Sequence, residues 1–292
     1  MWRTPTGTQK KPSDAHAEGI ARNPDDYRVL EKVPLRYDDV PIRFAEPHHD
    51  DTTVVIVDFE TTGLSHDTDK VIEIGMARCR YDSEGRLAGI DEILDMFEDP
   101  GEPISDNITK LTGITDDMVR GKHIDADKVR DMIRGDPVMA AHNAKFDRPF
   151  FDRIVPNDHR WKCTMEEIPW WDLGHGTRGL GELLMREGWF FDHHRAYADC
   201  LATAWLLGVV PGSLNLMLEP SVRVVAHGNS FDVKDKLKGR GYKWNQSERY
   251  WWTSTKDGAD GELEYLRGLY PDGYKARAVE IDSRAAYKLP DS

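Results

Sequence analysis

The chain has 292 residues, with 39 Lys and Arg against 52 Asp and Glu and a net charge of -13. Its hydrophobic fraction of 39% and its nine Trp can build folded cores, which excludes global disorder. Since no apolar run approaches the roughly 18 residues of a membrane span and none follows the first basic residues, we expect neither a transmembrane protein nor a secretory signal. Three widely spaced Cys without a C-x-x-C pair predict a reducing, cytoplasmic location and no disulfide framework.

The acidic balance argues against a general nucleic-acid coat protein, because such proteins use a basic face. The charge is uneven, with nets of -1 for residues 1–50, -13 for 51–208, -1 for 209–221 and +2 for 222–292. These blocks predict a flexible lead with an extended arm, a main domain, a linker and a small basic and aromatic module, in that order. The lead is expected to be flexible over residues 1–25. The apolar LNLML segment of the linker is expected to be either a short packed segment or a docking peptide.

The main block opens on strands and continues as alternating helices and strands. The β-branched run at 54–57 is typical of a strand buried on both faces, and 70–80 and 90–97 predict two more strands around a turn at 82–85. We expect further strands at 136–143 and 160–168, and helices at 104–114, 125–135, 145–155, 179–188 and 195–208. This order predicts an α/β fold, a mixed sheet with helices packed on it.

The last block, residues 222–292, predicts a small α+β module. Its elements follow the order β-α-β-β-α-β, which is the ferredoxin-like pattern, with the first helix capped near Ser230. Lysines and arginines alternate there with Tyr and Trp, which suits phosphate contact and base stacking. The alternative is equally open: the aromatic residues form the core of the module and the lysines its solvated surface.

Two carboxylates, Asp58 and Glu60, end the first buried strand. Strand residues two apart point to the same side, so these groups lie side by side and resist joint ionisation unless a cation neutralises them. A solvated strand end is the alternative. Asp199 lies on a strongly apolar helical segment and therefore needs a partner or a metal, whereas Asp147 could simply pair with Arg148 or Lys145. His193 and His194 precede the last helix, and apart from their spacing to Asp199 the two are equal candidates.

Four motifs occur in a fixed order: DFETTGL (58–64), LTGIT (111–115), HNAKFD (142–147) and His194 followed after four residues by Asp199. Together they resemble the DnaQ-like 3′–5′ exonucleases of the DEDDh subgroup, which include polymerase proofreading subunits and ribonuclease T. The resemblance covers residues 52–208 and implies an RNase H-like fold. It also selects His194 over His193, because only His194 has the family's gap to Asp199.

The resemblance implies a two-metal phosphodiester hydrolase. Asp58, Glu60 and Asp199 would hold the ion that carries the nucleophilic water, Asp58 would bridge to a second ion, and Asp147 would contribute directly or through water. Two Mg²⁺ ions suit an all-oxygen site, and Mn²⁺ also fits. His194 would be the general base.

The resemblance also implies a pocket for the 3′-terminal nucleotide around the turn Thr61, Thr62, Gly63 and Leu64, where Gly63 would permit a sharp turn. His142 and Asn143 either line the same pocket or fix the strand–helix turn by local hydrogen bonds.

The expected activity is metal-dependent 3′–5′ exonuclease action, on single-stranded DNA before RNA, releasing nucleoside monophosphates, with a DNA polymerase as a candidate partner. The alternative from another class is a non-catalytic polymerase or nucleic-acid adaptor on the same fold. The presence of every expected metal ligand weighs against that alternative.

Overall fold

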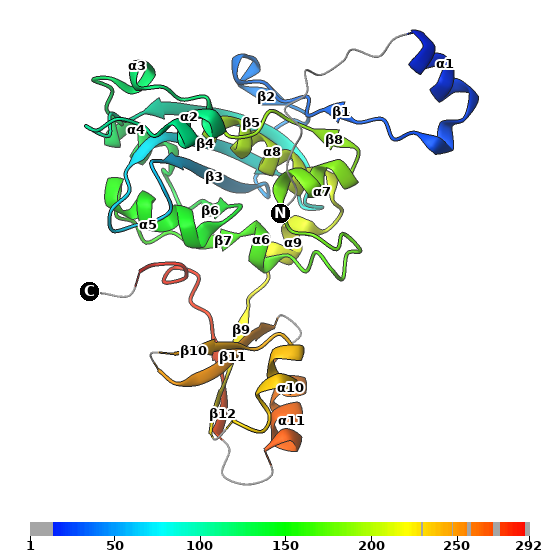
Figure 1. Cartoon of the computed structure of the whole chain (residues 1–292), viewed down its shortest axis with the longest axis vertical. Helices are drawn as coiled ribbons and strands as arrows, with labels where there is room; N and C mark the ends of the chain where they lie inside the picture. The colour runs from blue at the N-terminus through cyan, green and yellow to red at the C-terminus, as the bar shows by residue number, and fades with distance from the viewer. Residues whose placement is uncertain (1–13, 229, 247, 256–257, 271–274, 290–292) are drawn as a thin grey trace.

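The computed structural model describes residues 14–228, 230–246, 248–255, 258–270 and 275–289. These residues form a larger part, which holds most of the chain, and a smaller part built on a second sheet (Figure 1). Within these ranges, no helix combines the length and the apolar character needed to cross a membrane.

A six-stranded sheet is the centre of the larger part. Its strands are β2 (Ile42–Arg43), β3 (Thr52–Thr61), β4 (Val71–Tyr81), β5 (Leu87–Phe97), β6 (Val138–Ala141) and β7 (Trp161–Cys163). In space their order is β2-β5-β4-β3-β6-β7, with β3, β4 and β5 antiparallel and β6 and β7 added in parallel. This mixed sheet, with helices on both sides, confirms the expected RNase H-like fold class.

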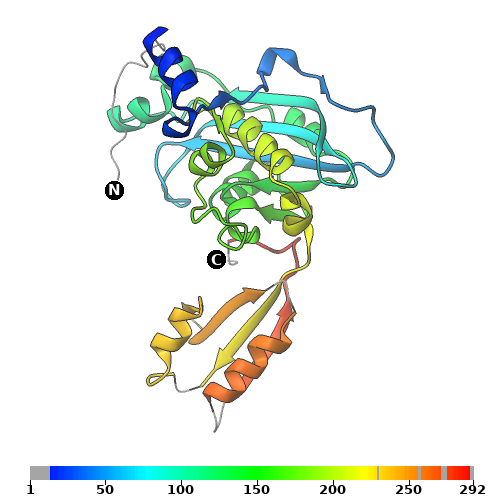
Figure 2. The same cartoon turned by 90° about the vertical axis from the view of Figure 1, so that its right-hand side faces the viewer.

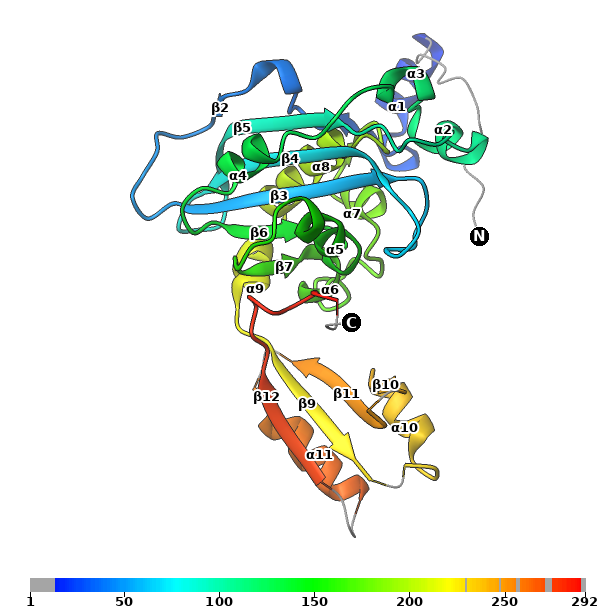
Figure 3. The same ribbon diagram turned by 90° about the vertical axis from the view of Figure 1, so that its left-hand side faces the viewer.

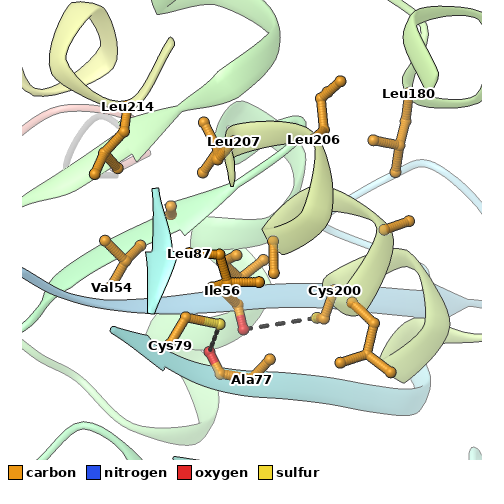
Figure 4. Close-up of a cluster of buried hydrophobic side chains, with 14 of the residues drawn as sticks. Val54, Ile56, Ala77, Cys79, Leu87, Leu180, Cys200, Leu206, Leu207 and Leu214 are labelled. Atoms are coloured by element: carbon orange, nitrogen blue, oxygen red, sulfur yellow. Dashed lines mark hydrogen bonds between the residues drawn. The ribbon is translucent and has the colours of Figure 1, made fainter. Parts of the chain in front are cut away.

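Helices cover both faces of the sheet. Helix α8 (Ala196–Val209) packs on the face seen in Figure 2, and α5 (Ala144–Ile154) and α4 (Ala126–Met132) pack on the face seen in Figure 3. Strand β3 supplies both cores by alternation: Val54 and Ile56 join the α8 core (Figure 4), while Val55, Val57 and Phe59 join the α5 core.

All three cysteines are buried and free, as the absence of a disulfide framework predicted. Cys79 and Cys200 lie in the α8 core, where the Cys200 thiol is 3.6 Å from the carbonyl oxygen of Ile56 (Figure 4). Burial raises the pKa of the Cys200 thiol well above its ordinary value. These thiols therefore act as small apolar core groups.

The remaining helices of the larger part are short. They are α1 (Asp14–Arg22), α2 (Asp106–Thr112), α3 (Asp116–Val119), α6 (Thr164–Glu167), α7 (Leu180–Arg186) and α9 (Ser213–Leu218), with 3-10 turns η1 (Pro24–Asp26) and η2 (Tyr37–Asp39). The strand expected at 160–168 ends at Cys163 instead. The Glu167 carboxylate accepts the backbone N–H of Cys163 at 2.9 Å and closes a helical turn there.

The structure corrects one expectation for the flanking segments and decides between the two alternatives for another. The lead was expected to be flexible through residue 25, but 14–22 form α1; residues 1–13 lie outside the described ranges. The expected linker contains α9, whose Leu214 and Met217 lie in the α8 core, so the packed-segment interpretation is correct. The arm packs as expected: β1 (Glu31–Lys32) pairs in parallel with β8 (Trp189–Phe190), and Val33 and Leu35 are buried.

The smaller part has a four-stranded antiparallel sheet. Its strands are β9 (Val222–His227), β10 (Lys243–Asn245), β11 (Tyr250–Thr255) and β12 (Lys275–Glu280), and its helices are α10 (Lys234–Gly239) and α11 (Asp260–Leu269). The spatial order β10-β11-β9-β12 and the chain order β-α-β-β-α-β agree with the expected module. Ser230 does not cap α10, which begins at Lys234. The Ser230 hydroxyl instead accepts the indole N–H of Trp251 at 2.8 Å.

The chain returns to the larger part after β12 (Figure 3). Trp161 donates its backbone N–H to the carbonyl of Ser283 at 2.9 Å, and Tyr287 donates its hydroxyl to Glu167 Oε1 at 2.8 Å. The buried guanidinium of Arg148 donates to the carbonyl of Arg284 at 2.7 Å. The smaller part therefore ends at Glu280, and residues 281–289 belong to the larger part.

Candidate active site

Strand β3 carries two carboxylates at its C-terminal end. Asp58 and Glu60 continue the alternating series of Val54 and Ile56, which face α8. Both carboxylates are therefore directed to the α8 side of the sheet, next to each other, as the spacing predicted.

Helix α8 brings a third carboxylate to the same place. The ligand-type oxygens of Asp58, Glu60 and Asp199 all lie within 4.8 Å of one another. Asp199 lies in the first turn of α8, and its Oδ2 accepts the backbone N–H of His194 at 2.9 Å. Asp199, which was expected to need a partner on this apolar helix, thus has a backbone amide as hydrogen-bond donor and two carboxylates as neighbours.

Asp147 approaches from the opposite face of the sheet, in the first turn of α5, and its side chain is 2% exposed. Burial raises the pKa of its carboxyl well above the ordinary value, although the backbone amides of Phe59 and Asp147 act in the other direction. The charges of Glu60 and Asp199 raise it further. Asp147 lies beside these three residues, but its carboxylate is not within 4.8 Å of all three of theirs.

The four carboxylates are difficult to ionise together. Burial, then the charges of Asp199 and Asp147, raise the pKa of Asp58 well above its usual range. Burial raises the pKa of Glu60 to about 8 and that of Asp199 to about 7. A divalent cation would relieve this repulsion, and the all-oxygen donor set fits Mg²⁺ or Mn²⁺.

The loop before α8 presents its two histidines differently. His194 is exposed and has a left-handed φ of 66°, a conformation that costs a non-glycine residue about 1–3 kcal/mol. Its backbone bond to Asp199 holds it there. His193 is exposed as well, but its ring packs on Phe191, with centroids 4.0 Å apart, and covers Gly181, where an added Cβ would lie 2.2 Å from the imidazole Cε1.

Partial burial lowers the pKa of His194 below its ordinary value, so its imidazole is neutral near pH 7. A neutral imidazole has a ring nitrogen that can accept a proton. His194 thus presents an exposed imidazole that is neutral near pH 7, on the residue whose backbone N–H bonds Asp199.

The polar side chains of the turn after β3 form hydrogen bonds within the loop itself. The Thr61 hydroxyl donates to the carbonyl of Gly63, and the Thr62 hydroxyl accepts the N–H of Lys70 at 3.0 Å. Gly63 is needed for space and not for a left-handed φ, because an added Cβ would lie 2.6 Å from both carboxylate oxygens of Asp69. Leu64 is 84% exposed at the tip of this turn, so it is the side chain of the four that is free to touch a ligand.

His142 and Asn143 also differ. His142 Nε2 donates to the carbonyl of Arg178 at 2.8 Å, and Nδ1 accepts from the Thr164 hydroxyl at 2.7 Å. Burial lowers the pKa of His142 to about 4, which keeps the ring neutral in this bridge. Both ring nitrogens are therefore used structurally, which favours the local interpretation for His142. Asn143 is exposed at the start of α5 and makes no side-chain capping bond.

Sequence reasoning missed Glu73, a fully buried carboxylate of β4. Its Oε1 accepts from Arg195 Nε at 2.8 Å, and its Oε2 accepts the backbone N–H of Ala196 at 2.9 Å. Glu73 thus fixes the first turn of α8, which carries Asp199, and its charge contributes to the raised pKa of Glu60. A charged residue between Ile72 and Ile74 in a buried strand was the available sequence indication.

Gly75 was also missed. It is the cross-strand partner of Asp58, and an added Cβ would lie 2.2 Å from the carbonyl carbon of Ala196 and 2.3 Å from the N of Tyr197. Only glycine lets the start of α8 lie against the backbone of β4. The position of Asp199 beside Asp58 and Glu60 depends on that approach.

Comparison with known proteins places this arrangement in a family. The model of the exonuclease family (RNase_T) matches residues 55–207, which is more than half of the chain. The PolC-type DNA polymerase III of Staphylococcus aureus is 34% identical over 172 residues, covering 53% of this chain. The chain spans only 11% of the length of that relative.

Solved structures of exonucleases resemble the chain as well. Exonuclease X in complex with 5′ overhanging duplex DNA is 27% identical, with 54% of this chain and 90% of that one covered and a TM-score of 0.41. E. coli exonuclease I in complex with an oligonucleotide is 17% identical, with 80% and 64% covered and a TM-score of 0.46. By the family match, the chain belongs to the exonuclease family, and the DnaQ-like class expected from its motifs is confirmed.

Proposed function

We propose that the chain is a metal-dependent 3′–5′ exonuclease that hydrolyses phosphodiester bonds at the 3′ ends of single-stranded DNA and releases nucleoside monophosphates. The observation that carries the proposal is the group of three carboxylates from β3 and α8 within 4.8 Å of one another, with Asp147 beside it. Half-buried acids so close together destabilise the fold when ionised, and a metal-dependent reaction on an anionic substrate explains why they are gathered here.

Asp58, Glu60, Asp147 and Asp199 would hold two Mg²⁺ ions, and Mn²⁺ suits the same oxygens. When bound, the ions would supply positive charge beside the phosphate and lower the pKa of a bound water. The chain's own contribution begins with His194, which would take the proton from the attacking water at its imidazole. The backbone bond from His194 to Asp199 would keep this base at a fixed place relative to the carboxylates.

Two exposed side chains border the proposed position of the 3′-terminal nucleotide. Leu64 projects from the turn after β3 and would pack against the last base, and Asn143 would offer its amide to the sugar or phosphate. Thr61, Thr62 and Gly63 would contribute through backbone groups, because the two hydroxyls already bond within the loop.

The relative that shares the matched region is a DNA polymerase, which supports DNA over RNA as the substrate and a DNA polymerase as the partner. An RNA 3′-end trimming activity is the runner-up. A non-catalytic adaptor would not need five buried or half-buried acids, Glu73 included, around one strand end.

The direct test uses an oligonucleotide labelled at its 5′ end. With Mg²⁺, we expect a ladder of shortened labelled products, and with EDTA no cleavage. Matched DNA and RNA strands run in parallel decide the substrate, and release of a labelled mononucleotide at the start of the reaction would contradict the 3′–5′ direction.

The matched variants are Asp58→Asn and Asp117→Asn. Asp58→Asn should lower the rate at least about 1000-fold, equivalent to roughly 4 kcal/mol of activation free energy. Asp117 is 83% exposed and remote in its contacts from the carboxylates, so its variant should keep the normal rate. Comparable activity of the two variants would reject the proposed site.

A further inference from the structure

The smaller sheet has one covered face and one open face. Helices α10 and α11 lie on the side seen in Figure 2, and the sheet itself is in front in Figure 3, on the same side of the molecule as α5. Val224, Ala226, Trp251 and Ala276 pack in the core with Leu237 of α10 and Leu266 of α11. These residues define the covered face.

Strand register then assigns the open face. Trp251 is opposite Ala226, so the next pair, Trp252 and Val225, points to the other side. The same alternation applies across all four strands. The open face consists of Lys243 and Asn245 of β10, Tyr250, Trp252 and Ser254 of β11, Arg223, Val225 and His227 of β9, and Lys275, Arg277 and Val279 of β12.

The charge of this open face is entirely positive. Among its strand residues, all of which are described, four are Lys or Arg and none is Asp or Glu. In a chain with a net charge of -13, a sheet face without one acid is the exception. A polyanion is the ligand that such a face attracts.

An aromatic ring lies in the middle of these cations. The guanidinium carbon of Arg223 is 4.7 Å and the ammonium of Lys243 is 5.3 Å from the centroid of the Trp252 ring. In the described part of the chain, the buried Nε of Arg223 has no hydrogen-bond partner, and its guanidinium lies over the Trp252 ring. Tyr250 and His227 meet edge to face beside them at 5.2 Å.

The aromatic residues of the sequence 242–252 therefore serve two purposes. Trp251 and Tyr242 belong to the covered core, and Trp244 packs on Trp251 at 5.3 Å, as the structural alternative predicted. Trp252 belongs to the open face with Arg223 and Lys243. A four-stranded sheet that displays aromatic rings on its open face is a known way of stacking single-stranded bases.

We propose that the open face binds single-stranded nucleic acid, with a base stacked on Trp252 and phosphates contacted by Arg223, Lys243, Lys275 and Arg277. That this strand is the substrate on its way to the carboxylates rests on the proposed function; the binding itself does not.

The open face adjoins the larger part. A cleft of about 1420 Å³ is lined by Arg223, Lys243 and Trp252 at the smaller sheet and by Asn143 and Lys145 at the start of α5. Acidic side chains such as Glu166 and Asp172 line it as well, whereas the four proposed metal ligands do not. The ion pair of Lys243 with Glu166 of α6, at 3.1 Å, joins the two parts across it. A strand held on the open face would thus lie beside the start of α5, the helix that carries Asp147.

The test is binding of a labelled single strand of about 30 nucleotides, measured by fluorescence anisotropy with full-length protein that carries Asp58→Asn. Trp252→Ala should weaken binding about 5- to 150-fold, the range for loss of one stacked base. The pair Lys275→Ala and Arg277→Ala lies on an exposed edge strand and should fold regardless. It should lower the slope of log affinity against log salt by about 1.4.

The matched controls are Trp244→Ala and Lys238→Ala, which remove a Trp and a Lys of the same part outside the open face. Both should bind like the parent. Open-face variants that bind like the parent, or controls that lose as much, would overturn the proposal. Equal binding of a duplex would exclude base stacking. Competition by polyglutamate at equal charge would show that the open face binds acidic proteins. Either result would overturn the proposal.

Cleavage by the unmutated chain is measured separately. A chain that binds through the open face but does not cleave with Mg²⁺ would refute the proposed function alone. A chain that cleaves while all variants bind normally would refute this inference alone.

Discussion

The carboxylate group of the larger part and the open face of the smaller sheet are opposites in charge and in setting. Asp58, Glu60 and Asp199 lie close together with raised or strongly raised pKa values, and the charge of Arg195 offsets the effect on Glu60 in part. The open face carries its own cations: Arg223 and Lys243 lie around Trp252, and Lys275 is exposed on the edge strand. The first region should therefore respond to metal and to protons, and the second to salt.

His194→Ala tests this separation with the largest expected effect of the variants outside the metal ligands. Loss of a general base typically lowers a rate about 100- to 10,000-fold. The rate is measured in single turnover with Mg²⁺ on a 5′-labelled strand, and binding of the same strand is measured by anisotropy. We expect the rate to fall and the affinity to change little.

His193→Ala is the matched control, because its ring packs on Phe191 and Gly181 and is not directed by Asp199. It should change the rate far less than His194→Ala. The assignment of the base is wrong when the two variants lose the same activity.

Gly75→Ala should damage the carboxylate site alone, with an intermediate effect. The new Cβ collides with the backbone of Ala196 and Tyr197, so α8 must shift and carry Asp199 with it. We expect a loss of about 100-fold in rate, the scale of an ångström of misplacement, and about 1–3 kcal/mol of unfolding free energy. Urea denaturation and the cleavage assay measure the two.

Gly268→Ala is the control, since Gly268 lies in α11 with open space around its Cβ position. It should leave the rate unchanged and affect stability by less than about 1 kcal/mol. A Gly75→Ala chain that cleaves normally would show that α8 does not need this close approach.

The smallest effect concerns pH. Without metal, the folded chain keeps protons on Glu60 and Asp199 up to pH of about 8 and about 7, whereas unfolded carboxyls lose them near pH 4. Between these pH values the folded state binds more protons than the unfolded state. The contribution of Glu60 and Asp199 to the free energy of unfolding is therefore greatest at low pH and falls as the pH rises to 8. Mg²⁺ should remove this penalty.

The gain in melting temperature on adding saturating Mg²⁺ should therefore be a few degrees larger at pH 8 than at pH 6, as measured by differential scanning fluorimetry. Asp117→Asn should behave like the parent and Asp58→Asn should lose most of the difference. A larger gain at pH 6 would contradict the raised pKa values.

The sequence predicted the sheet and the carboxylates well because both depend on local patterns. Alternation in β3 places Asp58 and Glu60 on one side, and the apolar character of α8 made Asp199 conspicuous. The linear order of motifs then identified the family. These features can be recognised in the sequence without knowledge of the packing.

The features that were missed depend on contacts distant in sequence. Gly75 matters because α8, some 120 residues later, reaches its backbone, and Glu73 matters because it bonds the first turn of that helix. Trp251 and Trp252 are adjacent in sequence, and only the register with β9 separates them into a core residue and a surface residue. The helical turn α6 was missed because Glu167 closes it by a side-chain bond.

The backbone N–H of Ile281 donates to the carbonyl of Ser221 at 3.0 Å. The chain thus leaves and rejoins the larger part at one point, so residues 222–280 are an insertion, tethered at both ends, rather than a tail. Truncation after Ser221 would also remove the carbonyl of Arg284 from Arg148, the neighbour of Asp147. Joining Ser221 to Ile281 by a short loop would delete the smaller sheet and leave that support of α5 in place.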